Sequence, residues 1–250
     1  DPTMIGPYKT DIGKLAYVGK QGVLCLMSES LYAPRKGYTS PNHRITPILS
    51  ETINKKDGRI LCSIFSSNLY RIQEVLNVLM KTDRNVVIVG KRLENTIMKA
   101  IDMKYVKFDK NRIKSIRQVN DENIFVLISD EREKQFSNMD RIVKGYDKFV
   151  KIKDTDTVVF ASPVYEGLEK SATRIFDRIA QIGADLVILP TKKYLDHHAS
   201  SEDLMMMIDL INPKYYMPVI GDYRDQVENA KVAYAIGMKE ENVLLKLNGQ

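Results

Sequence analysis

Six short apolar runs, separated by segments of helical spacing, limit this 250-residue chain to one broad class of fold. Each run is continuous and rich in Val, Ile and Leu, a pattern typical of strands that are buried on both faces. The runs are VLCLMS (23–28), RILCSIF (59–65), NVVIVG (85–90), NIFVLIS (123–129), DTVVFAS (156–162) and ADLVILP (184–190).

Helix-like segments lie between several of these runs, with apolar residues three and four positions apart. They cover residues 69–81, 92–103 and 166–182. Strands and helices that alternate in this way form right-handed crossovers and a parallel sheet that is covered on both sides. The sequence therefore predicts an α/β fold with a doubly wound parallel sheet flanked by helices.

The composition is that of a globular protein, with 44% hydrophobic and 28% charged residues. No apolar run approaches the roughly 20 residues of a membrane helix, and the N-terminus lacks the regions of a signal peptide. We therefore expect a cytoplasmic protein with no membrane partner. Cys25 and Cys62 lie in apolar runs without a metal-binding or disulfide pattern, so we expect two buried thiols. The abrupt start and end lead us to expect a piece of a longer protein.

The stretch 194–224 predicts a loop, a helix, a strand, a turn and a second helix, in that order. A serine caps the first helix and Pro213 stops it, and the buried strand that follows is broken at Gly221. His197 and His198 precede the first helix. Because open α/β sheets bind ligands at the carboxyl ends of their strands, this stretch is a candidate site.

Glu29 directly follows the first predicted strand. An acidic residue at the carboxyl end of a parallel strand is a better site candidate than one on a helix face. A helix cap or a solvated loop carboxylate explains Glu29 as well, and that alternative stays open.

The region 99–117 carries seven basic residues against two acidic ones, with Tyr105 and Phe108 interleaved. Such a surface suits phosphate contacts, although a merely solvated basic face is the commoner explanation. The formal net charge of +6 favours a polyanionic partner. The candidate phosphate-contacting residues are Lys104, Lys107, Lys110, Arg112 and Lys114.

Motifs of several enzyme classes are absent, among them GxxxxGK[ST], GxGxxG, GxSxG, HExxH and CxxC. The three histidines, His43, His197 and His198, cannot make a histidine-rich metal site within this chain. A carboxylate-based metal site stays open, although no spacing singles one out.

Several blocks, in the right order, resemble the ribonuclease J family, in the β-CASP subgroup of the metallo-β-lactamase superfamily. The blocks are GVLCLMSES, APRKGYTS, GRILCSIFSSNLYRIQEV, DTVVFASPVYEGLEKS, HHASSEDL and NPKYYMPVIGDYR. The resemblance implies a β-CASP domain over residues 23–190, flanked by segments of a metallo-β-lactamase (αββα) domain at 1–22 and 191–250. Family members hold two metal ions, zinc or manganese, and cut RNA. Their HxHxDH ligand motif would precede Asp1, so we expect no cofactor in this chain itself.

Two positions match the family's β-CASP motifs. The acidic residue after the first strand corresponds to Glu29, and the second histidine of a HxSGHAS pattern corresponds to His198 in YLDHHAS. The resemblance implies that His198 is a general acid on the leaving oxygen and that Glu29 steadies it, which suits an imidazole held by a carboxylate. We expect the two side chains to meet within hydrogen-bonding reach across the domain boundary.

Three positions depart from the family pattern. Ile220 stands where the family has the metal-ligating histidine of PVHGE, and Tyr194 replaces the first histidine of HxSGHAS. The glycine-rich, phosphate-binding TGSQGEP loop corresponds to SDEREKQ, whose acidic residues would repel phosphate; these are Asp130, Glu131 and Glu133. Losses at three parts of one site point to a degenerate paralogue.

The sequence thus predicts the β-CASP region of a ribonuclease J-like protein that has lost most or all catalytic power. Some Gram-positive-type bacteria carry two such paralogues, the weaker working as a partner of the active one. The resemblance therefore implies RNA and a homo- or hetero-oligomer as partners. Two alternatives stay open: an active metal-dependent ribonuclease that replaces the missing ligand with water or Asp222, and an RNA-binding scaffold that uses the basic face alone.

Overall fold

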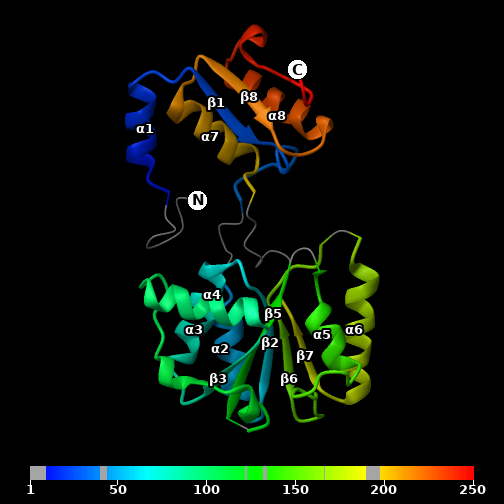
Figure 1. Ribbon diagram of the computed structural model, residues 1–250. Coiled ribbons are helices and arrows are strands. Elements are labelled where there is room, and N and C mark those ends of the chain that lie inside the picture. The colour runs from blue at the N-terminus through cyan, green and yellow to red at the C-terminus, as the bar shows by residue number, and fades with distance from the viewer. Residues whose placement is uncertain (1–9, 40–43, 122, 132–133, 166, 190–197) are drawn as a thin grey trace. The chain divides into compact units, whose positions relative to one another are not determined.

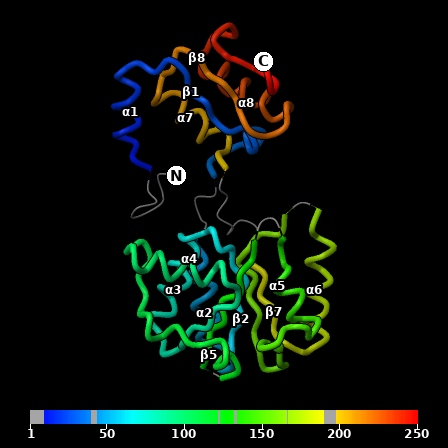
Figure 2. The backbone as a smooth tube through the Cα atoms, viewed as in Figure 1, coloured from blue at the N-terminus to red at the C-terminus, as the bar shows by residue number. Residues whose placement is uncertain are grey.

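The chain folds into two compact units, one made of Asp1–Pro41 with Leu195–Gln250 and the other of Asn42–Tyr194. Figures 1 and 2 show the elements of each unit, and all strand pairs among the described residues are parallel. The computed structural model describes residues 10–39, 44–121, 123–131, 134–165, 167–189 and 198–250.

The larger unit, Asn42–Tyr194, is built on a six-stranded sheet in the order β4-β3-β5-β2-β6-β7. Five of these strands are apolar runs that the sequence predicts. The sixth, β4, has only two residues, too few to produce a recognisable run. The strands are β2 (Ile60–Phe65), β3 (Asn85–Val89), β4 (Ile113–Lys114), β5 (Ile124–Asp130), β6 (Thr157–Phe160) and β7 (Asp185–Ile188).

Helices cover both faces of this sheet (Figure 1). One face carries α2 (Thr46–Lys55), α3 (Leu69–Leu79) and α4 (Lys91–Asp102), and the other carries α5 (Ser137–Val143) and α6 (Glu169–Ile182). Neighbouring strand residues serve opposite layers, since Cys62 packs with the first set and Leu61 with the second. The doubly wound α/β fold is therefore confirmed. Within the described residues, no helix is long and apolar enough to cross a membrane.

The smaller unit combines segments from both ends of the chain. Its elements are α1 (Ile12–Lys20), β1 (Cys25–Glu29), α7 (Ser201–Ile211), β8 (Tyr215–Val219) and α8 (Tyr223–Ala235). β1 and β8 form a two-stranded parallel sheet, and α7 and α8 pack on it around Tyr216. Helix α1 packs against α7 at Gly19, where a Cβ would lie 2.3 Å from the carbonyl oxygen of Leu210. Only glycine allows this approach.

The first apolar run belongs to the smaller unit, not to the six-stranded sheet. Its strand, β1, pairs with β8 from Cys25↔Tyr215 to Glu29↔Val219. Because this pairing ties the run to the C-terminal segment, the compact unit extends to Pro41 instead of ending at residue 22.

The expectation that this run is buried on both faces is wrong. Leu24 is 70% and Met27 is 61% exposed, and the thiol of Cys25 is exposed as well. The reason is that the helices of the unit cover a single face of this two-stranded sheet. Cys62 lies in the six-stranded sheet and is buried as expected, and its burial raises the pKa of the thiol to about 12.

Candidate functional site

The carboxyl edge of the β1–β8 pair carries the first candidate site, where Glu29 and Val219 end the two strands side by side. Just beyond them, the amide of Ser30 donates to the carbonyl oxygen of Ile220 at 3.2 Å. The buried Asn229 of α8 donates through Nδ2 to the carbonyl oxygen of Glu29 at 3.0 Å. These contacts hold the backbone on both sides of the Glu29 side chain.

Glu29 and His198 form a hydrogen-bonded pair, with 2.7 Å between Oε2 of the carboxylate and Nδ1 of the imidazole. The other carboxylate oxygen, Oε1, accepts from the amide of Ala199 at 3.0 Å. Both side chains are partly buried, 26% exposed for Glu29 and 18% for His198. The expected hydrogen-bonding reach is confirmed. The expected crossing of a domain boundary is wrong, because β1 and the His198 loop belong to the same unit.

Two further side chains contact His198, and a third holds one of these two in place. The hydroxyl of Thr39 donates to the carbonyl oxygen of His198 at 2.8 Å, and the carboxylate of Asp203 accepts from the amide of Thr39 at 2.7 Å. The ring of Tyr32 meets the imidazole edge-on, with 5.2 Å between centroids. Sequence reasoning missed these residues, because they come from a loop and a helix turn that only folding brings to His198.

A cavity of about 250 Å³ opens beside the pair, within the smaller unit. Its lining includes Ser28, Glu29, Thr39, His198, Asp203 and Met207. An imidazole anchored by a carboxylate at a cavity wall can hold a proton and pass it to a bound group. The arrangement is therefore suited to general acid–base chemistry.

Ile220 follows β8 and has a backbone conformation that suits other residue types. Its φ is +56°, in the left-handed region where Asn, Asp and His are enriched and a β-branched residue is an outlier. Its side chain is 60% exposed, so packing does not require isoleucine. Among the described residues, no group of three or more His, Cys, Asp and Glu could hold a metal ion. Tyr194, His43 and His197 lie outside the described residues.

A second polar cluster lies at the carboxyl edge of the six-stranded sheet, where β5 ends. The carboxylate of Glu131 accepts from the hydroxyl of Ser66 at 2.8 Å and from that of Ser129 at 2.7 Å. The guanidinium of Arg92 lies 3.1 Å from the same carboxylate. A carboxylate of the chain itself thus takes up these hydroxyl and guanidinium donors.

Asp130, the last residue of β5, is almost fully buried. Its Oδ1 accepts from the amides of Glu131 and Phe136, at 3.0 and 2.7 Å. Burial raises the pKa of this carboxyl to about 6, although the two hydrogen bonds act in the opposite direction. Arg132 and Glu133 of the same loop lie outside the described residues.

The predicted phosphate-contacting residues of region 99–117 differ in their surroundings. Lys104, Lys107 and Lys110 are exposed, and Lys110 forms a surface ion pair with Asp102. Lys114 is half-buried in β4. Three lysines of the region therefore present their charge to solvent, in agreement with either a phosphate-contacting or a solvated basic face.

Arg112 corrects part of this expectation. Its Nη2 donates to the carbonyl oxygens of Leu79 and Thr82, at 3.0 and 2.7 Å, where α3 ends. Phe108, 5.3 Å from the Arg112 guanidinium, is only 8% exposed and cannot stack on a base. The β4 strand, which continues directly from Arg112, pulls this side chain against α3, a consequence of folding that charge counting does not reveal.

Comparison with known proteins finds a match within the six-stranded unit. Residues 57–179 match the family model described as Ribonuclease J, beta-CASP domain. Ribonuclease J2 of Bacillus subtilis (strain 168) is 30% identical over 238 residues, which cover 94% of this chain and 43% of that protein. Ribonuclease J 1 of Streptococcus pyogenes is 28% identical over 243 residues, with 96% and 43% covered.

A third relative shows the same degree of identity. Ribonuclease J of Synechocystis is 30% identical over 253 aligned residues, which cover 100% of this chain and 40% of that protein. The chain thus spans less than half the length of these curated relatives, while almost all of it aligns with each of them.

Proposed function

We propose that this chain belongs to the ribonuclease J family through its β-CASP domain, and that it is the β-CASP region of an RNA-degrading nuclease that has lost most of its catalytic power. In this proposal the protein binds RNA and works chiefly as the partner of an active paralogue. The match to the family carries the assignment to nucleases, and the loss of activity rests on separate observations.

Ile220 is the observation that carries the loss of activity. By resemblance this position holds a metal-ligating histidine, and isoleucine offers no lone pair to a metal. The backbone there keeps a φ of +56°, which histidine or asparagine adopts more readily than isoleucine. The backbone conformation at this position thus suits the residue that the resemblance implies better than the isoleucine that occupies it.

The acidic loop after β5 supports the same proposal. By resemblance it corresponds to a glycine-rich loop that holds a phosphate group. Here the carboxylate of Glu131 occupies the hydroxyls of Ser66 and Ser129 and faces Arg92. A phosphate that approached these donors would have to displace a negative charge already bound to them, which disfavours its binding.

The Glu29–His198 pair is the part of the site that we propose to be intact. A carboxylate at 2.7 Å from Nδ1 orients the imidazole and favours the tautomer with the proton on Nδ1. Nε2 is then the nitrogen that can exchange a proton with the leaving oxygen of a substrate. Thr39 and Tyr32 serve as positioning residues, because they hold the backbone and ring of His198.

Zinc or manganese chemistry, which the family uses, does not fit the residues described here. The first site offers Glu29, His198 and Asp203, but the two carboxylates are already bound to amide and imidazole groups, and Ile220 adds no ligand. When bound, such ions would activate a water molecule and stabilise the developing charge on a phosphate. No step of this proposal is therefore routed through a metal held by this chain.

Manganese-dependent cleavage of a 5′-phosphorylated RNA tests the loss of activity, with the full-length protein that contains this chain compared with an active ribonuclease J. We expect turnover at least about a hundredfold slower, because one well-placed ion or acid–base group contributes several kcal/mol and each 1.4 kcal/mol changes the rate about tenfold. Turnover equal to that of the active enzyme would overturn the proposal.

The intact Glu29–His198 pair favours one second candidate, an active ribonuclease that replaces the missing ligand with water or Asp222. The variant Ile220→His separates the two. If the protein is degenerate, the variant should gain metal affinity in calorimetry with little gain in cleavage, because the acidic loop still disfavours the substrate. If the wild-type protein already binds two ions per chain and cleaves RNA, the second candidate holds.

The proposed role as a partner has its own test. When the full-length protein is mixed with its active paralogue, light scattering after gel filtration should show a mixed oligomer. Separate elution of the two proteins at micromolar concentration would exclude that role. An RNA-binding scaffold would instead bind RNA through exposed lysines such as Lys104 and Lys107 without either partner or turnover.

A further inference from the structure

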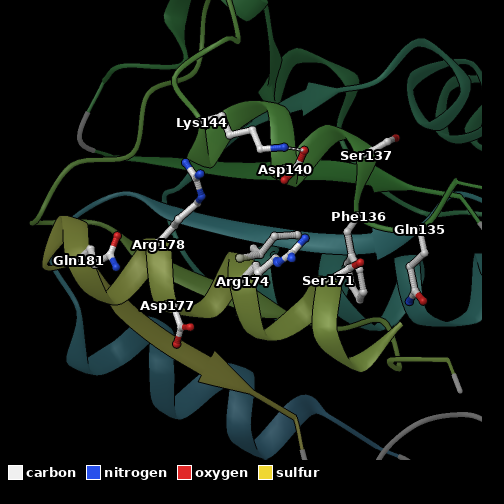
Figure 3. A pocket seen from close by; sticks show the side chains of 11 residues that line it. Gln135, Phe136, Ser137, Asp140, Lys144, Ser171, Arg174, Asp177, Arg178 and Gln181 are labelled. Carbon is white, nitrogen blue, oxygen red and sulfur yellow. Dashed lines mark hydrogen bonds and ion pairs between the residues drawn. The ribbon is translucent and has the colours of Figure 1, made fainter. Parts of the chain in front are cut away.

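A groove runs between α5 and α6 on the surface of the larger unit (Figure 3). Its volume is about 780 Å³. Phe136 and Ile175, which form part of its lining, are 2% and 1% exposed and belong to the hydrophobic core. The floor of the groove is therefore part of the packed fold. Its remaining lining is polar, and includes Gln135, Ser137, Ser171 and Gln181.

Two arginines stand along this groove. Arg174 and Arg178 lie one turn apart on α6, and Figure 3 shows both side chains on the side of the helix that faces α5. Both are exposed, and within the described part of the chain neither has a hydrogen-bond or ion-pair partner. Each therefore presents a guanidinium group that has several free donors.

Among the described residues, neither acidic residue of the groove forms an ion pair with these arginines. The carboxylate of Asp140 is bonded to the ammonium of Lys144, at 2.5 Å on α5. Asp177 also lines the groove, although its side chain and that of Arg178 point in different directions in Figure 3. The lining thus carries three basic residues against two acidic ones, a net positive charge of one, among mostly polar side chains.

We propose that the α5–α6 groove binds consecutive phosphate groups of single-stranded RNA, at a surface separate from the Glu29–His198 site. This inference rests on the proposed function in that RNA is the ligand, and it adds a second binding surface. A guanidinium binds a phosphate through two parallel hydrogen bonds, so Arg174 and Arg178 can hold neighbouring phosphates. From Ser171 to Gln181 the helix rises about 15 Å, which is long enough for a short run of nucleotides.

The chemistry of the lining favours RNA over an acidic peptide. Peptide recognition uses pockets for side chains or a free strand edge, whereas the apolar residues of this groove, Phe136 and Ile175, are closed off by packing. Hydroxyl and amide groups, such as those of Ser171 and Gln181, suit phosphate and ribose oxygens. No aromatic ring in the lining is exposed for stacking, so we expect binding without base preference.

Fluorescence anisotropy with a labelled 12-nucleotide uridine RNA tests this proposal on the 250-residue chain, over a series of salt concentrations. The test variant is R174Q/R178Q. The control is K148Q/K170Q, which also removes two positive charges from exposed positions of this unit, but at residues that do not line the groove. Circular dichroism melts confirm that both variants fold.

We expect R174Q/R178Q to weaken binding about tenfold or more at low salt. The plot of log K against log salt should become shallower. The magnitude of its negative slope should decrease by about 1.4, which corresponds to two lost contacts at about 0.7 each. The control should keep the wild-type slope. R174K/R178K should bind between the two, because it keeps the charge and loses the two-pronged geometry.

Three other results would contradict the groove proposal, and a fourth would also contradict part of the proposed function. Equal losses in the test and control variants would show that only overall charge matters and would overturn the groove site. A polyglutamate peptide that binds as well as RNA, with the same sensitivity to R174Q/R178Q, would make the groove an acidic-peptide site. If the wild-type chain binds RNA and R174Q/R178Q binds equally, the groove proposal fails and the proposed function stands. If the wild-type chain binds no RNA, the RNA-binding part of the proposed function fails as well.

Discussion

Replacement of Asp130 by asparagine should make the larger unit more stable at neutral pH and leave its stability unchanged at acidic pH. The carboxyl of Asp130 has a pKa of about 6 in the folded protein, raised by burial from an ordinary value of 3.8. The raised pKa means that the folded protein holds the protonated form of this carboxyl more firmly than the unfolded chain does. The stability that the protonated carboxyl contributes is fully present below pH 3.8 and is lost as the pH rises through 6.

The size of the effect follows from the shift. A difference of about 2 pKa units corresponds to about 3 kcal/mol between acidic pH and pH 8, at about 1.4 kcal/mol per unit. Asparagine keeps an oxygen that can accept from the amides of Glu131 and Phe136, and it carries no charge at any pH. The variant should therefore equal the wild type near pH 4 and exceed it by about 3 kcal/mol at pH 8.

Urea unfolding followed by far-UV circular dichroism, at several pH values between 4 and 8, measures this difference. Equal m-values in the two proteins would show that the same transition is compared. The control is Asp102→Asn, an exposed carboxylate that pairs only with Lys110 in the structure described here. The reasoning is refuted if the Asp130→Asn difference has no pH trend, or if Asp102→Asn shows a trend of the same size.

Three other substitutions test separate parts of the fold. Asp156→Ala should destabilise the larger unit by about 3–5 kcal/mol in urea unfolding, because it leaves the guanidinium of Arg59 buried without its carboxylate. Asp185→Ala breaks the exposed pair with Lys56 and should cost less than about 1 kcal/mol. Similar costs for the two variants would contradict the role of burial. Ile220→Asn should relieve roughly 1 kcal/mol of backbone strain at a left-handed position, so hydrogen exchange in β8 should be unchanged or slower. The control Ile188→Asn, at a strand position of 45% exposure, should accelerate exchange in β7. Faster exchange in both variants would argue against strain at Ile220. Gly19→Ala should lower the melting temperature of the smaller unit, because its Cβ would lie 2.3 Å from a backbone oxygen of α7. Gly13→Ala on the same helix, where the nearest atom lies at 3.5 Å, should be neutral or stabilising by up to about 1 kcal/mol. Equal effects of the two substitutions would show that the close approach is unimportant.

The sequence alone is sufficient to predict the α/β class and five of the six strands of the large sheet. Apolar runs such as 124–130 are buried on both faces, and a run of this kind reports its own burial without reference to its neighbours. The same holds for α7 and β8, whose start and end are marked by a capping serine, Pro213 and Gly221. Local chemistry determines these elements, so local patterns reveal them.

The pairing of Glu29 with His198 was predictable only because both positions match a family pattern. The residues are 169 positions apart in the chain, and neither composition nor periodicity links them. Thr39 and Asp203 lie in blocks that resemble the family, yet no pattern links them or Tyr32 to His198. Their contacts become visible only in the folded chain.

Tertiary structure alone decided which unit each segment joins and which side chains remain free. The apolar run at 23–28 has the pattern of a central strand, yet it forms one half of a two-stranded sheet with Cys25 exposed. Arg112 has the charge of a phosphate ligand, yet backbone carbonyl oxygens take up its Nη2 donors. Arg174 and Arg178 line a groove instead, with no ion-pair partner among the described residues. The physical reason is that strand partners and the neighbours of a charged group lie far apart in sequence, so a local pattern carries no information about them.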